Sequence, residues 1–187
     1  MKKRCGWVPE NNIDYLKYHD VEWGVPVRDD KKLFEMLLLE GFQAGLSWLT
    51  VLKKRDNFRN AFSGFDFIQI AKYNNQDILR LMENEGIIRN KLKIESSIKN
   101  AQAFIEIQEE FGSFNEYIWS FVDGKPIKNE CESWKQIPPK TVLSDKISKD
   151  LKKRGMNFVG STIIYAFLEA VGIVNDHEVS CFRYSEV

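Results

Sequence analysis

Hydrophobic positions recur every three to four residues along most of this chain, which is the period of an amphipathic α-helix. Leu33, Phe34 and Leu37 follow this period after Asp29, a residue type that caps helices, and Gly41 marks the predicted end of the helix. No segment alternates with a period of two for long enough to predict a β-strand. The same pattern predicts helices over residues 48–55, 67–70, 76–84, 88–111, 114–121, 145–154 and 161–171.

The least regular stretch is residues 124–143, which holds Pro126, Pro138 and Pro139. We read it as a long ordered connection and as the boundary between two lobes. The chain as a whole, residues 1–187, is predicted to be one all-α domain built from two helical lobes.

Composition narrows the class of protein. Of the 187 residues, 43% are hydrophobic and 29% charged, as expected for a globular chain, and the net charge of zero argues against binding to nucleic acid by bulk charge. No apolar run follows the basic start, and no stretch is long enough to cross a membrane, so we expect a cytoplasmic protein. The aromatic share of 13% is high enough to supply a pocket as well as a core.

Potential metal ligands gather at the two ends of the chain. Cys5 and His19 lie near the N-terminus, His177 and Cys181 lie near the C-terminus, and the chain has no other histidine. Two thiolates and two imidazoles suit tetrahedral Zn²⁺, and four protein ligands leave no open position, so the zinc would be structural. The alternative is four unrelated residues that do not converge.

A turn with two glycines joins the last two predicted helices, giving a helix-hairpin-helix pattern at about 145–171. Gly155 can end the first helix, and Gly160 permits close approach of the backbone before the second. Backbone N–H groups there, with Lys153 one turn away, could bind a DNA phosphate. An ordinary turn beside a solvated basic helix end is the competing interpretation.

The segment after this turn resembles the helix-hairpin-helix superfamily of DNA glycosylases, in which a Val-Asp-x-His segment carries the catalytic aspartate. The corresponding residues here begin at Val174 and place Asn175 at the position of that aspartate. Thr162 stands where the bifunctional members of the superfamily have a nucleophilic lysine. The resemblance therefore implies no carboxylate base at 175 and no strand cleavage through a Schiff base.

Over nearly its whole length the chain is also similar to the constitutive bacterial DNA-3-methyladenine glycosylase I family. The motifs that carry this resemblance are RCGW at 4–7, YHD at 18–20, EWG at 22–24, LEG at 39–41, QAGLSW at 43–48, GIIR at 86–89, WSFV at 119–122, KKRG at 152–155 and VNDH at 174–177. They stand in the family's order, and chance agreement does not account for them.

The family resemblance implies a monofunctional enzyme that hydrolyses the N-glycosidic bond of 3-methyladenine in alkylated double-stranded DNA, initiating base excision repair. It also implies that Tyr18 and Trp48 stack on the flipped base and that one zinc joins the termini. From helical spacing, Tyr15 faces the same way as Tyr18, and Trp23 is a candidate for the pocket wall. We expect a monomer.

Glu40 and Leu46 are each open to two interpretations. Glu40 falls in the last turn of an apolar helix, where a carboxylate opposes the dipole, and this marks it as a catalytic residue unless it points to water or pairs with an arginine. Leu46, on a predicted loop beside the pocket, is either a wedge that fills the space left by the flipped base or a buried core residue.

Two other functions compete with the glycosylase. One is a non-catalytic helix-hairpin-helix module that binds damaged DNA. The other is a zinc-stabilised helical protein that binds another purine-like ligand.

Overall fold

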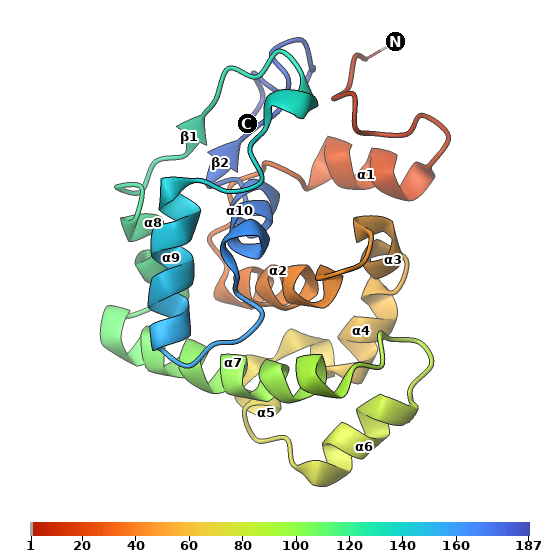
Figure 1. Cartoon of the computed structure of the whole chain (residues 1–187), viewed down its shortest axis with the longest axis vertical. Coiled ribbons are helices and arrows are strands. Elements are labelled where there is room, and N and C mark those ends of the chain that lie inside the picture. The colour runs from red at the N-terminus through yellow and green to blue at the C-terminus, as the bar shows by residue number, and fades with distance from the viewer. Residues whose placement is uncertain (1) are drawn as a thin grey trace.

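In the computed structural model, which describes residues 2–187, helices carry most of the chain (Figure 1). The prediction of a mostly helical protein is confirmed. The α-helices are α1 (Ile13–Val21), α2 (Asp30–Gln43), α3 (Trp48–Leu52), α4 (Arg55–Ala61), α5 (Phe67–Ile70), α6 (Asn75–Glu83), α7 (Lys91–Phe111), α8 (Phe114–Ser120), α9 (Val142–Lys153) and α10 (Ser161–Ala170). Two short 3-10 helices are η1 (Ser63–Phe65) and η2 (Trp134–Gln136).

Helix α2 is the centre of the fold, and it packs against α10, α7 and α3. Every residue from Leu33 to Phe42 is buried, because the neighbouring helices surround α2 beyond its first turn. Asp29 caps the helix by accepting a hydrogen bond from the backbone N–H of Lys32. The predicted end at Gly41 is wrong: the helix continues to Gln43, and Gly41 instead gives room for the 155–160 turn, where Phe158 packs against it.

Three other predicted helix boundaries differ from the structure. Helix α9 starts at Val142 with Thr141 as its cap, not at residue 145. The long helix starts at Lys91 with Asn90 as its cap, not at residue 88. The predicted helix 48–55 is two helices, since the chain turns between α3 and α4.

The prediction that the chain has no β-strand is wrong for two short segments. Strands β1 (Ile127–Lys128) and β2 (Val174–Asn175) pair in parallel. A pair of two-residue strands is too short to show alternation in the sequence. Its effect is to bind the irregular stretch 124–141 to the C-terminal segment, where a further bridge joins Cys131 to Glu178.

The two ends of the chain lie on the same side of the molecule (Figure 1), and the N–H of Phe182 donates to the carbonyl of Lys3 at 2.9 Å. This arrangement brings α1, which follows the N-terminal segment, next to the segment that follows α10. Among the helices of residues 2–187, none is long and apolar enough to span a bilayer.

Candidate functional site

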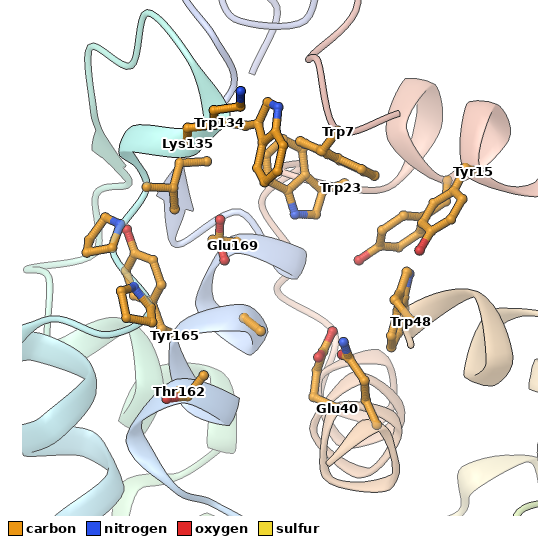
Figure 2. Close-up of a pocket in the computed structure, with 16 residues that line it drawn as sticks. Trp7, Tyr15, Trp23, Glu40, Trp48, Trp134, Lys135, Thr162, Tyr165 and Glu169 are labelled. Carbon is orange, nitrogen blue, oxygen red and sulfur yellow. The ribbon is translucent and has the colours of Figure 1, made fainter. Parts of the chain in front are cut away.

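A cavity of about 420 Å³ opens between α1, α2, α3, α10 and the segment around η2 (Figure 2). Helices from both ends of the chain therefore contribute to one site. Its lining residues are Trp7, Tyr15, Tyr18, Trp23, Glu40, Gln43, Trp48, Trp134, Lys135, Ile137, Pro138, Pro139, Thr162, Tyr165, Ala166 and Glu169.

Aromatic rings form one wall of the cavity, and all four predicted aromatic residues, Tyr15, Tyr18, Trp23 and Trp48, line it. The rings of Tyr18 and Trp48 lie 5.2 Å apart between centroids with their planes tilted by 48°. The indole N–H of Trp48 is buried and has no hydrogen-bond acceptor among the described residues. A buried donor without a partner is costly, so this indole is suited to an acceptor that a ligand would bring.

Glu40 reaches the cavity from α2, and its side chain points toward the space between the walls (Figure 2). It is 4% exposed, and within residues 2–187 no hydrogen bond or ion pair reaches its carboxylate. Burial raises the pKa of Glu40 to about 8, because the charged form loses its hydration without gaining a partner. The alternatives in which Glu40 pairs with an arginine or points to bulk water do not describe this geometry.

A second acid, Glu169, lines the cavity from α10 across from Glu40 (Figure 2). Burial, together with the nearby Asp176 and Glu40, raises the pKa of Glu169 well above its ordinary value. Glu169 was not predicted from the sequence, although Thr162, Ala166 and Glu169 have the spacing of one helix face, which could have revealed it. Trp134 and Lys135 were not predicted either, because they lie in the irregular stretch where no periodicity marks a face.

The structure brings three of the four potential metal ligands together. The donor atoms of Cys5, His19 and Cys181 all lie within 4.8 Å of one another, and all three residues are buried. The fourth, His177, lies beside this group, with its ring centroid 5.2 Å from that of His19. Its Nε2 atom is buried without a hydrogen-bond partner among the described residues, as expected for a nitrogen that binds a metal.

Both histidines are held from behind by a second polar side chain. His19 Nδ1 lies 2.8 Å from Asp20 Oδ1, and His177 Nδ1 lies 3.0 Å from Asn175 Oδ1. Such contacts fix the ring and leave the Nε2 side for a metal, and His19 Nε2 lies 3.5 Å from the sulfur of Cys181. Asn175 thus orients an imidazole and does not line the cavity.

The ionisation of these groups also suits a metal. Burial lowers the pKa of His177 to about 3, so its imidazole is neutral at physiological pH. The hydrogen bond between the two buried thiols lowers the pKa of Cys181 and raises that of Cys5, so the pair readily holds one thiolate. Neutral imidazole and thiolate are the forms that bind Zn²⁺.

The indole rings of Trp7 and Trp23 lie between the cavity and the potential metal ligands. The ring of Trp23 lies 4.5 Å from that of His177, and the ring of Trp7 lies 5.5 Å from that of His19, measured between centroids. Both tryptophans line the cavity. Loss of order at the termini would therefore reach the aromatic wall directly.

The loop between α2 and α3, residues 44–47, carries Leu46 outward. Its side chain is 43% exposed, which rules out the core interpretation. Gly45 adopts a left-handed conformation with φ of 79°, and this turns the loop away from the helix.

The two glycines of the 155–160 turn lie at the helix ends where they were predicted. Gly155 ends α9 with φ of 91°, and Gly160 is the N-cap of α10. Lys153 is exposed beside the turn. Arg154, in contrast, is engaged by the carboxylates of Glu110 and Asp150 and is not free to bind a phosphate.

Comparisons with known proteins agree with this site. The sequence model of the methyladenine glycosylase family matches residues 7–184. The DNA-3-methyladenine glycosylase 1 of Escherichia coli is 49% identical over 182 residues, covering 97% of both chains.

Two solved structures have the same fold. A crystal structure of 3-methyladenine DNA glycosylase I is 51% identical, with a TM-score of 0.93 over 96% of this chain and 98% of that one. The Staphylococcus aureus glycosylase, solved to explain 3-methyladenine recognition, is 38% identical, with a TM-score of 0.90 over 92% of each chain. With a cavity of aromatic rings around a buried carboxylate and similarity along nearly its full length, this chain belongs to the methyladenine glycosylase family.

Proposed function

We propose that this protein is a monofunctional DNA glycosylase that hydrolyses the N-glycosidic bond of 3-methyladenine in alkylated double-stranded DNA and leaves an abasic site. The observation that carries the proposal is Glu40, a buried carboxylate without a partner that faces a cavity lined by aromatic rings. The related enzymes are named for 3-methyladenine, a flat methylated base that suits a cavity of this kind.

Recognition of the base follows from charge and shape. An adenine methylated at N3 is cationic within DNA, so it gains cation–π attraction as well as stacking against Tyr18 and Trp48. Its amino edge donates a hydrogen bond to Glu40, and the positive charge of the base favours the ionised carboxylate. Tyr15 offers a hydroxyl to the same base, and Trp23 closes the wall behind it.

The chemistry requires little beyond this recognition, because the methylated base is already a good leaving group. Water adds to C1′ of the sugar, the electron pair of the glycosidic bond moves to the base and neutralises its charge, and the water proton passes to solvent. Thr162, which stands where the bifunctional glycosylases have a nucleophilic lysine, has no amine to form a Schiff base, so we expect the strand to remain uncut.

Access to the base requires that it leaves the duplex, and two exposed elements serve this step. Leu46 fills the gap in the stack after the base has flipped. Backbone N–H groups of the 155–160 turn other than those of Gly155, Met156 and Asn157, which donate within the protein, hold a phosphate, with help from Lys153. These roles make residues 145–171 a helix-hairpin-helix within a single glycosylase domain spanning 1–187.

Cys5, His19, His177 and Cys181 would hold one Zn²⁺. The unpartnered Nε2 of His177 and the thiolate character of Cys181 fit this ion. Bound zinc supplies a cross-link between the ends of the chain, and it has no part in the hydrolysis. Its effect on function passes through Trp7 and Trp23, whose rings pack on the histidines.

The test is release of free base from methylated duplex DNA, with products resolved by chromatography. We expect wild type to release 3-methyladenine, to spare 7-methylguanine and to leave the strand uncut. Glu40→Gln should be impaired, whereas Glu83→Gln, the same change at an exposed position of α6, should not. If folded, metal-loaded wild type binds methylated duplex but releases nothing, the non-catalytic DNA-binding module is the better account. Activity on free nucleosides without DNA would favour the purine-binding alternative.

A further inference from the structure

The ammonium group of Lys93 is buried in α7, where it lies against the end of α2. The residue is 7% exposed, and its Nζ donates to the carbonyls of Phe42 at 2.9 Å and Ala44 at 2.7 Å. No carboxylate among residues 2–187 forms an ion pair with it. A buried lysine is rare without a counterion, and here the negative end of the α2 dipole and its last free carbonyls take that place.

Asn100 lies seven residues further along the same helix, which places it two turns, about 10 Å, along the axis. Its Nδ2 donates to the carbonyl of Asn157 at 2.9 Å, and its Oδ1 accepts from the N–H of Asn157 at 2.8 Å. Asn100 is 5% exposed. Its side chain thus pairs with the backbone of the 155–160 turn as a neighbouring strand would.

Phe158, the residue after Asn157, lies close both to Lys93 and to the end of α2. Phe158 adopts a left-handed conformation with φ of 54°, and its Cβ and carbonyl lie 3.4 Å from where a side chain on Gly41 would begin. Its ring centroid lies 5.7 Å from Lys93 Nζ. The loop after α2 and the turn before α10 therefore converge over one face of α7, which crosses the molecule below both (Figure 1).

We propose that Lys93 and Asn100 are positioning residues that fix the 44–47 loop and the 155–160 turn at one spacing, so that both contact the same duplex. This rests on the proposed function, in which Leu46 enters the base stack and the turn holds a phosphate. Neither residue lines the cavity, so we expect affinity for the free base to be retained when either is changed. A shift of about 1 Å between two DNA contacts can lower the rate about a hundredfold.

The experiment compares Lys93→Met, Lys93→Arg and Asn100→Leu with wild type. Affinity for a duplex carrying an abasic-site analogue, its dependence on salt, and affinity for free 3-methyladenine are measured for each variant. Lys91→Met is the matched control, since Lys91 lies on the same helix but is exposed and forms an ion pair with Glu95 on the surface. Thermal unfolding shows which variants are folded.

We expect Lys93→Met and Asn100→Leu to weaken duplex binding at least about tenfold while affinity for the free base is retained. The salt dependence should be unchanged, because neither side chain contacts a phosphate, and Lys93→Arg should recover most of the affinity. Lys91→Met should leave duplex binding near that of wild type, and any loss should come with a smaller salt dependence, which marks a lost phosphate contact and not a lost position.

The double variant Lys93→Met with Leu46→Ala gives a second readout. If Lys93 acts by placing Leu46, the pair should bind the duplex no more weakly than the weaker single variant.

The proposal is wrong if the folded variants bind duplex like wild type, or if duplex and free-base affinities fall together. Asn100→Leu decides the question if Lys93→Met does not fold. A wild type that binds the duplex but releases no base would refute the proposed hydrolysis and leave this comparison intact.

Discussion

The metal-ligand end and the base cavity each leave a buried nitrogen without a partner among the described residues, His177 Nε2 in the first and Trp48 Nε1 in the second. Their surroundings differ. Around His177 lie the sulfur and nitrogen atoms of Cys5, His19 and Cys181. The two imidazole rings of this group are held in place by Asp20 and Asn175. Around Trp48 lie ring faces and a carboxylate that no other group in residues 2–187 holds.

This difference indicates which kind of ligand each site binds. Converging sulfur and nitrogen donors fit a small metal cation, whereas ring faces with one carboxylate fit a flat organic cation. Damage to the first should act on folding, and damage to the second should act on the reaction.

The largest effect should come from removing a metal ligand. His177→Ala or Cys181→Ser should abolish zinc binding and lower the free energy of unfolding by at least about 4 kcal/mol, because metal binding contributes directly to folding. Metal content and thermal unfolding measure this. Cys131→Ser, a buried thiol outside the ligand set, should keep the metal. Full stability of a metal-free His177→Ala would contradict the comparison.

Glu40→Gln should lower the rate of base release from saturated enzyme about a hundredfold, because it removes a charge aimed at the cationic base. Unlike the metal-ligand variants, it should not lower thermal stability at neutral pH. Single-turnover release of 3-methyladenine measures the loss. A variant with wild-type rates would show that the rings alone select the base.

Trp48→Leu should reduce base release about tenfold, since it removes one stacking face and keeps the cavity apolar. Trp134→Leu is the matched change at the rim, where the side chain is 42% exposed, and should have a smaller effect. Equal losses from both variants would mean that the base does not stack on Trp48.

The pH dependence of stability sharpens the assignment of Glu40. Its pKa is raised from 4.5 to about 8, so the unfolded chain releases this proton first and the contribution to stability falls as pH rises from about 4.5 to 8. Glu40→Gln should therefore match wild type near pH 4 and be more stable at pH 8, by about 1–4 kcal/mol at about 1.4 kcal/mol per pKa unit. Denaturant unfolding at the two pH values measures this. A constant difference across the range would show that the carboxylate is solvated.

The helices were predictable because periodicity and caps are local signals. Asp29 and Ser113, for example, cap the helices that begin just after them. The helix boundary at Gly41 was not predictable, because its glycine serves a contact with Phe158, more than a hundred residues away. The pairing of β1 with β2 was missed for the same reason.

The cavity shows the same division. Glu40 was noticeable because a carboxylate is unfavourable in the last turn of an apolar helix. Glu169 was not, since α10 has the pattern of a core helix and the cavity beside it exists only after α1, α2 and the η2 segment have come together. The unpartnered nitrogens of Trp48 and His177 likewise appear only in three dimensions.

The central claim is that a buried carboxylate between aromatic rings recognises 3-methyladenine. Calorimetric titration of wild type and Glu40→Gln with free 3-methyladenine and with adenine tests it most directly. The account predicts that wild type binds 3-methyladenine more tightly than adenine and that Glu40→Gln loses most of this difference while remaining folded. Equal affinity of wild type for the two bases, or an unchanged preference in Glu40→Gln, would contradict it.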